Sequence, residues 1–268
     1  MKRVNKKKNC IFKNISSKEK VKYLKKSKKL DTFTKKIAIQ VHVYYPDLLD
    51  EIYENIQQMP YEYDLYISTD TDEKMDIIKK YFKNKKMKNV SIEKIENKGR
   101  DILPFIIQLK PRIKDYSYVC HLHTKKSKYA DFGDDWRRYL YHNLFGSKEN
   151  LETIFYIFEK HKSIGIIYPK TYHVIENNME IGSNKELLDD LCNRLNIKNT
   201  FRNVFPSGSM FWIRGELLKQ LFDVVDISDF PKENGQIDGT FAHAIERVFV
   251  VLAEQNKYKY LQIINEIK

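Results

Sequence analysis

The sequence lacks the features of several protein classes. Its 268 residues contain no run of about 18 apolar residues, the length with which a helix crosses a bilayer. The N-terminus is basic but is not followed by the apolar stretch of a secretory signal peptide, so we expect a cytoplasmic protein. With nine glycines and seven prolines, the chain is neither collagen-like nor a Gly/Pro-rich disordered segment. An apolar content of 42% then indicates a globular protein of one large domain or two small ones.

Cysteine is also scarce. Cys10, Cys120 and Cys192 lie too far apart in the sequence to form a zinc-binding motif, and they make no disulfide framework. This usage is typical of a reducing compartment.

Negative charge is nearly missing from the first 36 residues, where Glu19 and Asp31 stand against fifteen Lys or Arg. This segment has a net charge of +13, which leaves residues 37–268 at −1 of the overall +12. We therefore predict a lysine-rich arm, residues 1–36, and one nearly neutral domain, residues 37–268. Such an arm suits an anionic membrane surface, at about 1 kcal/mol for each basic residue near it, and a solvated tail is an equal alternative. Because the domain is neutral, we do not expect a nucleic-acid partner.

Strands and helices alternate along the domain. Apolar runs rich in β-branched residues predict strands, and apolar residues at helical spacing predict the helices between them. Strands are expected at 36–45, 64–68, 90–95, up to 121, at 164–169 and at 210–213, with helices after Asp47, from Glu73, from Ile102, from Gly133 continuing through Phe158, at 185–195 and after Thr240. This alternation predicts an α/β fold with a mostly parallel sheet flanked by helices. Residues 171–204 are more polar, and we expect an insertion that covers a site.

A polar cluster ends one predicted strand. His121, His123, Lys125 and Lys126 follow the apolar run Tyr118–Cys120 directly. In an open α/β sheet, ligands bind beyond the carboxyl ends of the strands, so we expect a binding site here. A buried histidine beside solvated lysines is the simpler alternative, but the clustering of both residue types favours a site.

The turn before the helix at Ile102 carries a second polar group. Gly99 suits a tight turn with positive φ, Arg100 can bind phosphate with two nitrogens, and Asp101 is expected to cap the helix. A helix N-terminus behind a glycine turn also favours an anion. An ordinary turn is the alternative.

Three further positions have competing interpretations. Trp136 is expected either to stack on a sugar face or, more simply, to anchor its helix. The small residues Ser207–Ser209 let the backbone approach a ligand, although a glycine bulge at a strand start has the same pattern. Asp238 lies just before the last long helix, where a capping role competes with a catalytic one.

Five motifs follow one another along the chain: Asn97–Asp101, His121–Ser127, Gly133–Arg137, Phe205–Trp212 and Ile237–Arg247. Together they resemble the rhamnan synthesis F family of bacterial cell-surface polysaccharide proteins, and the resemblance covers roughly residues 37–250. Five ordered motifs are much more specific than any one of them. The resemblance implies glycosyl transfer during the assembly of rhamnose-containing polysaccharide.

The order of elements also resembles the GT-A glycosyltransferase plan, so we expect a GT-A-like domain. The resemblance implies Asp238 as the general base of an inverting transfer, with Glu246 in reserve. The implied acceptor residues are Trp136, Arg137, Gly208 and Ser209. The implied donor residues are Tyr44, Asp70, Asn97, Gly99, Arg100, Asp101, His121, His123, Lys125 and Lys126.

The metal position departs from that plan. His121 and His123 stand where the GT-A plan has an Asp-x-Asp pair that binds a metal on the sugar diphosphate. Imidazoles are poor ligands for Mg²⁺ and suit Mn²⁺ or Zn²⁺ better, whereas Lys125 and Lys126 can neutralise the diphosphate directly. We favour transfer without a cofactor, and a divalent metal, Mn²⁺ or Mg²⁺, on the two histidines is the alternative.

The leading hypothesis is a glycosyltransferase that moves a sugar from a nucleotide-sugar donor to a glycan or polyprenyl-linked acceptor at the inner face of the cytoplasmic membrane. The alternative from another class is a non-catalytic glycan-binding or assembly subunit that recruits partners through the arm. Binding of a nucleoside diphosphate that depends on His121 and Lys125 would distinguish the two.

Overall fold

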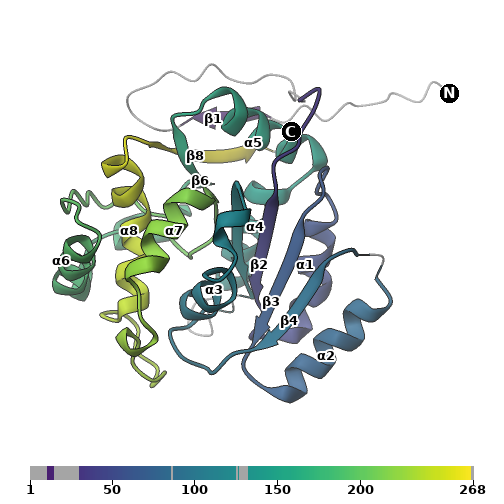
Figure 1. The fold of residues 1–268 in the computed structure, drawn as a ribbon, viewed down its shortest axis with the longest axis horizontal. Coiled ribbons are helices and arrows are strands. Elements are labelled where there is room, and N and C mark those ends of the chain that lie inside the picture. The colour runs from purple at the N-terminus through teal and green to yellow at the C-terminus, as the bar shows by residue number, and fades with distance from the viewer. Residues whose placement is uncertain (1–10, 15–29, 86, 125, 127–131, 267–268) are drawn as a thin grey trace.

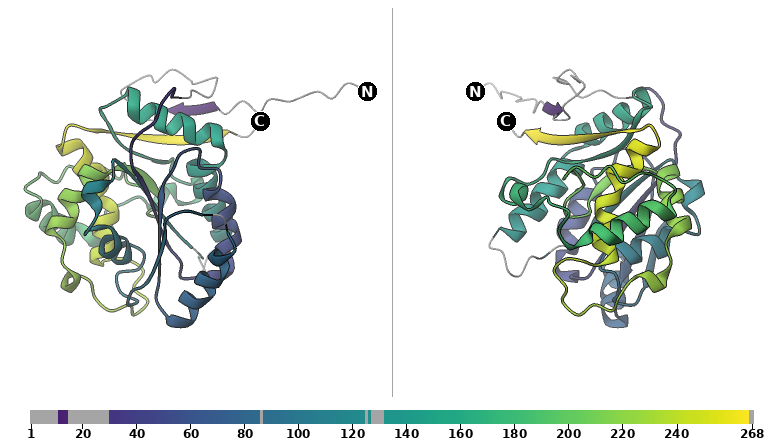
Figure 2. Two further views of the ribbon diagram at one scale, coloured as in Figure 1. Left: turned by 45° about the vertical axis from the view of Figure 1, so that its right-hand side comes forward. Right: turned by 90° about the vertical axis from the view of Figure 1, so that its left-hand side faces the viewer.

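The computed structural model describes residues 11–14, 30–85, 87–124, 126 and 132–266. Within them, an eight-stranded sheet in the order β1-β8-β6-β7-β5-β2-β3-β4 lies between two layers of helices (Figures 1 and 2). The strands are β1 (Ile11–Asn14), β2 (Ile37–His42), β3 (Asp64–Thr69), β4 (Val90–Lys94), β5 (Tyr118–His123), β6 (Ile164–Pro169), β7 (Phe211–Arg214) and β8 (Lys259–Glu266).

One half of the sheet is parallel. β4, β3, β2 and β5 run in the same direction, so their carboxyl ends lie along one edge. The register places His42 of β2 beside Ser68 of β3 and His123 of β5. The polar ends of three strands that are far apart in the sequence therefore meet.

The other half of the sheet brings a loop to the same edge. β7 runs antiparallel between β5 and β6, and His121 pairs with Phe211, the first residue of β7. Because β7 is antiparallel to β5, the segment Ser207–Met210 before it lies beside the end of β5. β8 continues the sheet parallel to β6, and β1 pairs antiparallel with β8.

Two layers of helices cover the sheet (Figure 2). The first layer packs α1 (Leu49–Ile56), α2 (Asp72–Lys83), α4 (Gly133–Phe145) and α5 (Lys148–Lys160) on one face. The second packs α3 (Ile102–Leu109), α6 (Lys185–Arg194), α7 (Gly215–Val224) and α8 (Phe241–Gln255) on the other. Short 3-10 helices are η1 (Pro46–Leu48), η2 (Ile113–Asp115), η3 (His173–Asn178), η4 (Gly182–Asn184) and η5 (Ile227–Asp229).

The strand sequences explain this burial. Ile37, Ile39 and Val41 of β2 pack under the first layer, whereas Ala38 packs under the second. A strand that is covered on both faces needs apolar residues at successive positions, which is why β2, β5 and β6 read as continuous apolar runs. The predicted α/β fold with a mostly parallel sheet is confirmed, and it is consistent with a GT-A-like domain.

Several predicted details are wrong. Asp47 does not cap a helix, because η1 intervenes and α1 starts after Leu48 without a side-chain cap. The helix expected to continue from Gly133 to Phe158 is two helices, because Ser147 starts a new one and accepts a hydrogen bond from the Asn150 amide (3.3 Å). Strands β1 and β8 and helix α7 were not predicted, since β1 and β8 depend on pairing across the whole chain.

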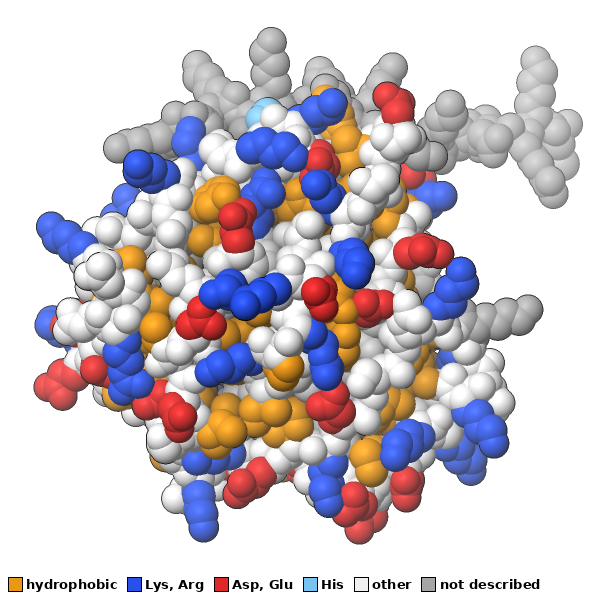
Figure 3. Space-filling view, in the orientation of Figure 1, with side chains coloured by type: hydrophobic (Ala, Val, Ile, Leu, Met, Phe, Trp, Pro, Cys, Tyr) orange, Lys and Arg blue, Asp and Glu red, His pale blue; other side chains and the backbone are white. Residues whose placement is uncertain are grey.

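Part of the expected arm belongs to the sheet. β1 lies within residues 1–36 and pairs with β8, and Leu30 is buried in the core. The arm boundary stays a prediction, because most of residues 1–36 lie outside the described residues. On the face in Figure 3, basic and acidic side chains are interspersed. No helix among the described residues is both long enough and apolar enough to span a membrane.

Candidate active site

The turn between β4 and α3 is built around Gly99. Its φ is +64°, and a Cβ atom added there would lie 2.5 Å from the ring of Phe230, so only glycine fits. Arg100, at φ +55°, continues the left-handed turn. This backbone path delivers Asp101 to the carboxyl end of β5.

Asp101 does not cap α3, contrary to the prediction. Its side chain makes no capping bond, and its Oδ2 instead lies 3.0 Å from His121 Nε2 and 4.0 Å from His123 Nε2. Burial opposes ionisation of this carboxyl, but the two neighbouring histidines outweigh burial and hold the pKa of Asp101 well below its usual range. Asp101 is therefore a carboxylate at neutral pH.

A chain of buried amides holds the His121 ring in place. Gln108 Nε2 donates to the Ile67 carbonyl (3.0 Å), and Gln40 Nε2 donates to Gln108 Oε1 (3.0 Å). The other end of the Gln40 amide, Oε1, lies 2.7 Å from His121 Nδ1. Together with the Asp101 contact at Nε2, this chain fixes the orientation of the buried imidazole.

Two other histidines are held neutral. Burial lowers the pKa of His42 to about 4, and its Nδ1 lies 3.0 Å from Ser68 Oγ. Burial and the nearby Arg100 and Arg247 lower the pKa of His243 to about 4. His243 Nδ1 accepts from Thr240 at the start of α8. His42 at the end of β2 and His243 on α8 are therefore neutral imidazoles at neutral pH.

The described side chains do not fit the metal that the GT-A plan implies. Both nitrogens of His121 are already in contact with protein oxygens, Gln40 Oε1 (2.7 Å) and Asp101 Oδ2 (3.0 Å). His123 Nε2 donates to the Gly208 carbonyl (2.8 Å). No group of three or more His, Cys, Asp or Glu side chains within the described ranges is arranged to hold a metal ion. The two histidines act here as hydrogen-bond donors rather than as a ligand pair.

The segment before β7 is bound to α8 through Glu246. Glu246 Oε1 accepts from the Gly208 amide (2.8 Å) and from Ser209 Oγ (3.2 Å). Both Gly208 and Ser209 have positive φ, at +86° and +55°, and a Cβ atom on Gly208 would lie 2.9 Å from Leu140. At this segment the backbone closely approaches the Glu246 carboxylate and the ring of Trp136.

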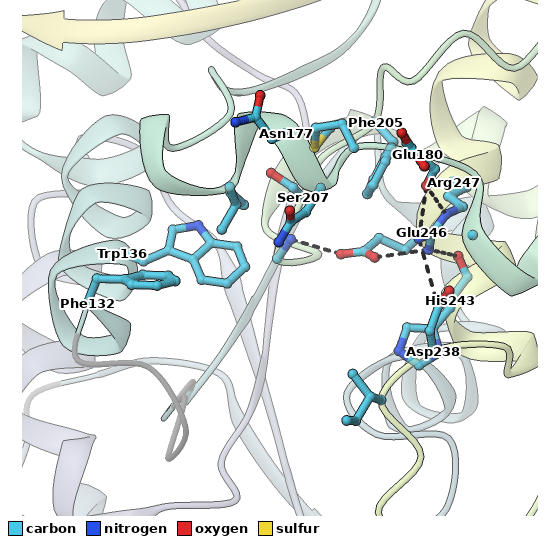
Figure 4. A pocket seen from close by; sticks show the side chains of 16 residues that line it. Phe132, Trp136, Asn177, Glu180, Phe205, Ser207, Asp238, His243, Glu246 and Arg247 are labelled. Carbon is cyan, nitrogen blue, oxygen red and sulfur yellow. Dashed lines mark hydrogen bonds and ion pairs between the residues drawn. The ribbon is translucent and has the colours of Figure 1, made fainter.

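Two adjoining cavities share Glu246 as a lining residue. The smaller cavity, about 180 Å³, is lined by Arg100, Asp101, Ile102, His123, Trp136, Gly208, Ser209, Ala242, His243 and Glu246. The larger cavity, about 620 Å³, shares Trp136, Gly208, His243 and Glu246 with it. Figure 4 shows Phe132 and Trp136 on one side of the larger cavity, facing Glu246 and Arg247 of α8.

Asp238 lines the larger cavity but is not the helix cap, since Thr240 takes that position. Its Oδ1 accepts from Asn184 Nδ2 (2.7 Å) and its Oδ2 from the Ser183 amide (3.1 Å). Burial opposes ionisation, but these hydrogen bonds and the nearby Arg247 lower the pKa of Asp238. Asp238 therefore joins α8 to the 171–204 segment.

Arg247 lies between the two carboxylates. Its Nη2 is 3.5 Å from Asp238 Oδ1, and its Nη1 is 3.8 Å from Glu246 Oε2. Arg100 is held differently: it donates to the Gln236 carbonyl, and its Nε lies 3.8 Å from Glu233 Oε2. Both guanidinium groups are therefore in contact with carbonyl or carboxylate oxygens of the protein.

Two lysines from other parts of the chain lie over the aromatic rings of the loop that follows β2. Lys74 lies 3.8 Å from the ring centre of Tyr44 and pairs with Asp70 (2.6 Å). Lys126 lies 5.0 Å from the ring centre of Tyr45 and pairs with Asp47. Thr124 Oγ1 accepts from the amides of both tyrosines (2.9 Å each), which ties this loop to the end of β5.

The remaining predicted residues are placed apart from the cavities or are not described. Arg137 is 1% exposed and its guanidinium is bound by Glu51 and Asp134, so we do not retain it in the acceptor site. Asn97 is exposed on the turn before Gly99 and lines neither of the two cavities. Lys125 lies outside the described residues.

Sequence patterns alone missed several residues of this site. Gln40 and Gln108 are buried amides inside apolar elements, and a glutamine within an apolar strand was the available signal. Lys74 had no distinguishing pattern, and Thr124 lay within the His121–Ser127 motif but had no assigned role. His243 and Arg247 lay within a recognised motif but had no assigned role.

A family model described as Rhamnan synthesis protein F matches residues 3–258. The chain belongs to this family. It is similar to the curated Uncharacterized protein WxcX from two strains of Xanthomonas campestris pv. campestris, at 36% identity over 220 residues, which is 81% of this chain. The matched region is 31% of WxcX, so the chain spans about a third of the length of these relatives.

Membership in the Rhamnan synthesis protein F family confirms the predicted resemblance and associates the chain with polysaccharide synthesis. Each of the five motifs that predicted this family contributes at least one residue to the two adjoining cavities. The contributors include Asp101, His123, Trp136, Gly208 and Glu246, one from each motif. The features that identify the family are thus gathered around one site.

Proposed function

We propose that this domain is an inverting glycosyltransferase of polysaccharide synthesis, which transfers a sugar from a nucleotide-sugar donor to a hydroxyl of a glycan. The observation that carries the proposal is the position of Glu246, whose carboxylate lies where the two cavities meet. One cavity would hold the transferred sugar and the other the acceptor, so that the base stands between the reacting groups.

In the proposed step, Glu246 accepts the proton of the acceptor hydroxyl while the hydroxyl oxygen bonds to the anomeric carbon of the donor. The bond from that carbon to the diphosphate oxygen breaks, and the nucleoside diphosphate leaves with the electron pair. Removal of the proton in the transition state contributes about 10²- to 10⁴-fold in rate in such reactions.

Glu246 suits this role better than Asp238, the residue favoured by the family pattern. Both oxygens of Asp238 accept hydrogen bonds that tie down the 171–204 segment, and its lowered pKa makes it a weaker base. Glu246 uses Oε1 to hold Gly208 and Ser209, and directs Oε2 toward Arg247 at 3.8 Å. Asp238 is retained as a positioning residue.

The small cavity supports the donor-sugar side of the proposal. Asp101 is ionised there, and carboxylates and imidazoles are suitable partners for sugar hydroxyls. Trp136 offers an aromatic face to both cavities. Lys74 in the first turn of α2 and Lys126 after β5 are the described cations that we assign to the diphosphate, together with Lys125. The family description supports rhamnose as the sugar.

The test is to incubate the full chain with nucleotide sugars, including nucleotide-activated rhamnose, and a rhamnose oligosaccharide, and to detect the extended product by mass spectrometry. We expect transfer from one donor, with release of an equal amount of nucleoside diphosphate. If the protein binds oligosaccharide but neither binds nucleoside diphosphate nor consumes any donor, it is the non-catalytic glycan-binding subunit instead.

A further inference from the structure

We propose that the acceptor is a glycan chain of at least three units, whose outer unit occupies a third, polar cavity between the end of β6, the 203 turn and β8. This inference rests on the proposed function and concerns the acceptor side of the same site. The third cavity has a volume of about 410 Å³ and is lined by Lys170, Thr171, Glu176, Asn177, Met179, Glu180, Asn203 and Gln262.

The three cavities lie in a row. The small cavity shares Glu246 and three other residues with the large one, and the large one shares Asn177, Met179 and Glu180 with the third. The first and third cavities have no lining residue in common. Figure 4 shows Asn177 and Glu180 near Phe205, away from Asp238. An acceptor that runs from its reacting hydroxyl at Glu246 through the large cavity into the third must therefore be elongated.

The chemistry of the walls changes along this row. The large cavity has apolar and aromatic walls, including Phe132, Trp136 and Phe205, which suit the flat faces of sugar rings. In the third cavity, Met179 is the one apolar residue, and the others carry amide, carboxylate, hydroxyl or ammonium groups. Such groups pair with sugar hydroxyls.

This lining distinguishes a glycan from a polyprenyl chain. A polyprenyl chain laid along the third cavity would bury polar side chains against hydrocarbon without hydrogen bonds, which is unfavourable. A sugar unit there replaces water on the same groups. We infer that any lipid part of the acceptor lies beyond the third cavity, separated from the reacting hydroxyl by several sugar units.

The third cavity has a fixed frame. Lys170 pairs with Glu176 (2.9 Å), and its backbone carbonyl accepts from Tyr139 Oη (3.0 Å). The Lys170 backbone amide donates to the carbonyl of Ile263 in β8 (2.9 Å). Asn203 and Gln262 line the cavity from a turn and from β8, and neither takes part in these Lys170 contacts; Gln262 also forms a hydrogen bond with the buried Tyr168.

The experiment measures kcat/KM for acceptors of one to four rhamnose units at saturating donor. We expect kcat/KM to rise by roughly tenfold between one and three units and then to level off, because each added hydrogen-bonded unit contributes modestly. Gln262→Ala and Asn203→Gly, which suits the φ of +56° at position 203, should each lower the trisaccharide-to-monosaccharide ratio about three- to tenfold. Asn193→Ala, on the exposed side of α6, is the control and should leave the ratio unchanged.

Calorimetry of trisaccharide and monosaccharide binding separates failure of this inference from failure of the proposed function. If no donor supports transfer but the trisaccharide binds more tightly than the monosaccharide, and Gln262→Ala removes the difference, the inference holds and the enzymatic function does not. A trisaccharide that is no better than the monosaccharide in either measurement overturns the inference. An undiminished advantage in both cavity variants does so as well.

Discussion

At the scale of single residues, Glu246 and Asp238 line one cavity in different surroundings. Glu246 holds the segment before β7 and lies between two cavities, whereas Asp238 holds Asn184 and Ser183. Arg247 stands between them and is 7% exposed at its side chain. The same charge chemistry therefore supports a reacting role at one position and a positioning role at the other.

This difference predicts unequal effects of two isosteric variants. Glu246→Gln keeps an oxygen for Gly208 and Ser209 but cannot take a proton, so we expect kcat to fall by about 10²- to 10⁴-fold. Asp238→Asn should lower kcat by roughly tenfold or less, because it disturbs the positions of residues 183 and 184 and weakens the contact with Arg247 but leaves the proposed base in place. Steady-state kinetics measures kcat for both variants. An unchanged melting temperature shows that each variant is folded. The reverse order of effects would make Asp238 the base.

The lowered pKa of His42 predicts a neutral ring at pH 7. In ¹⁵N NMR spectra of labelled protein at pH 7, the ring nitrogens of His42 should have the shifts of a neutral imidazole, because burial opposes its protonation. The spectrum of His42→Gln assigns these signals. A charged His42 ring at pH 7 would contradict the prediction.

At the scale of elements, turns bring the site together. The β4–α3 turn at Gly99 delivers Asp101, and the turn at Gly208 delivers the backbone that Glu246 holds. Both glycines have positive φ and closely packed neighbours. The residue type at these turns follows from the path of the backbone rather than from direct contact with a ligand.

Two glycine variants separate backbone strain from crowding. Gly99→Ala combines a φ of +64° with a contact of 2.5 Å to Phe230, so we expect a loss of about 2–5 kcal/mol in unfolding free energy. Gly235→Ala has a similar φ, +77°, and no neighbour within 4 Å, so about 1–2 kcal/mol should be lost. Urea unfolding measures both. Equal losses would show that Phe230 moves aside without cost.

At the scale of the whole molecule, most of the net positive charge lies in residues 1–36. Residues 37–268 are nearly neutral, and the face in Figure 3 mixes both signs. The lysine-rich residues 1–36 remain our proposed contact with an anionic membrane. The buried polar edge, by contrast, makes folding sensitive to pH.

We predict that stability falls as the pH drops from about 6.5 to about 4. His42 and His243 have pKa values lowered to about 4 in the folded protein, against 6.5 as the ordinary value. Between these values the unfolded chain binds more protons than the folded one, so acid favours unfolding, by roughly 1–2 kcal/mol for each pH unit. Asp101, whose pKa is also lowered, adds a further loss at lower pH.

Urea unfolding at pH 7, 6, 5 and 4.5 measures this slope. His42→Gln removes one of the titrating groups, so the slope of that variant should be smaller. A stability that is constant over this range would show that neither histidine is held neutral by the fold.

By itself, the sequence determined the α/β class, most of the elements, the family and the five motifs that line the site. These depend on local periodicity and on residue types at short spacing, which a chain carries without its fold. Only the tertiary structure decided what Asp101 does. The sequence is compatible with an Asp101 that caps α3 and with an Asp101 that contacts His121. The path of the backbone at Gly99 places the side chain beside His121.

The tertiary structure also decided the surroundings of the buried polar groups. Gln40 and Gln108 are 68 residues apart, and Glu246 reaches Gly208 across 38 residues. The sheet order brings these groups together, and hydrogen bonds between them depend on positions within fractions of an ångström. Residue types marked the strand ends and turns where these groups gather, and the geometry of the long-range contacts is the basis of the roles that we propose for Glu246 and Asp238.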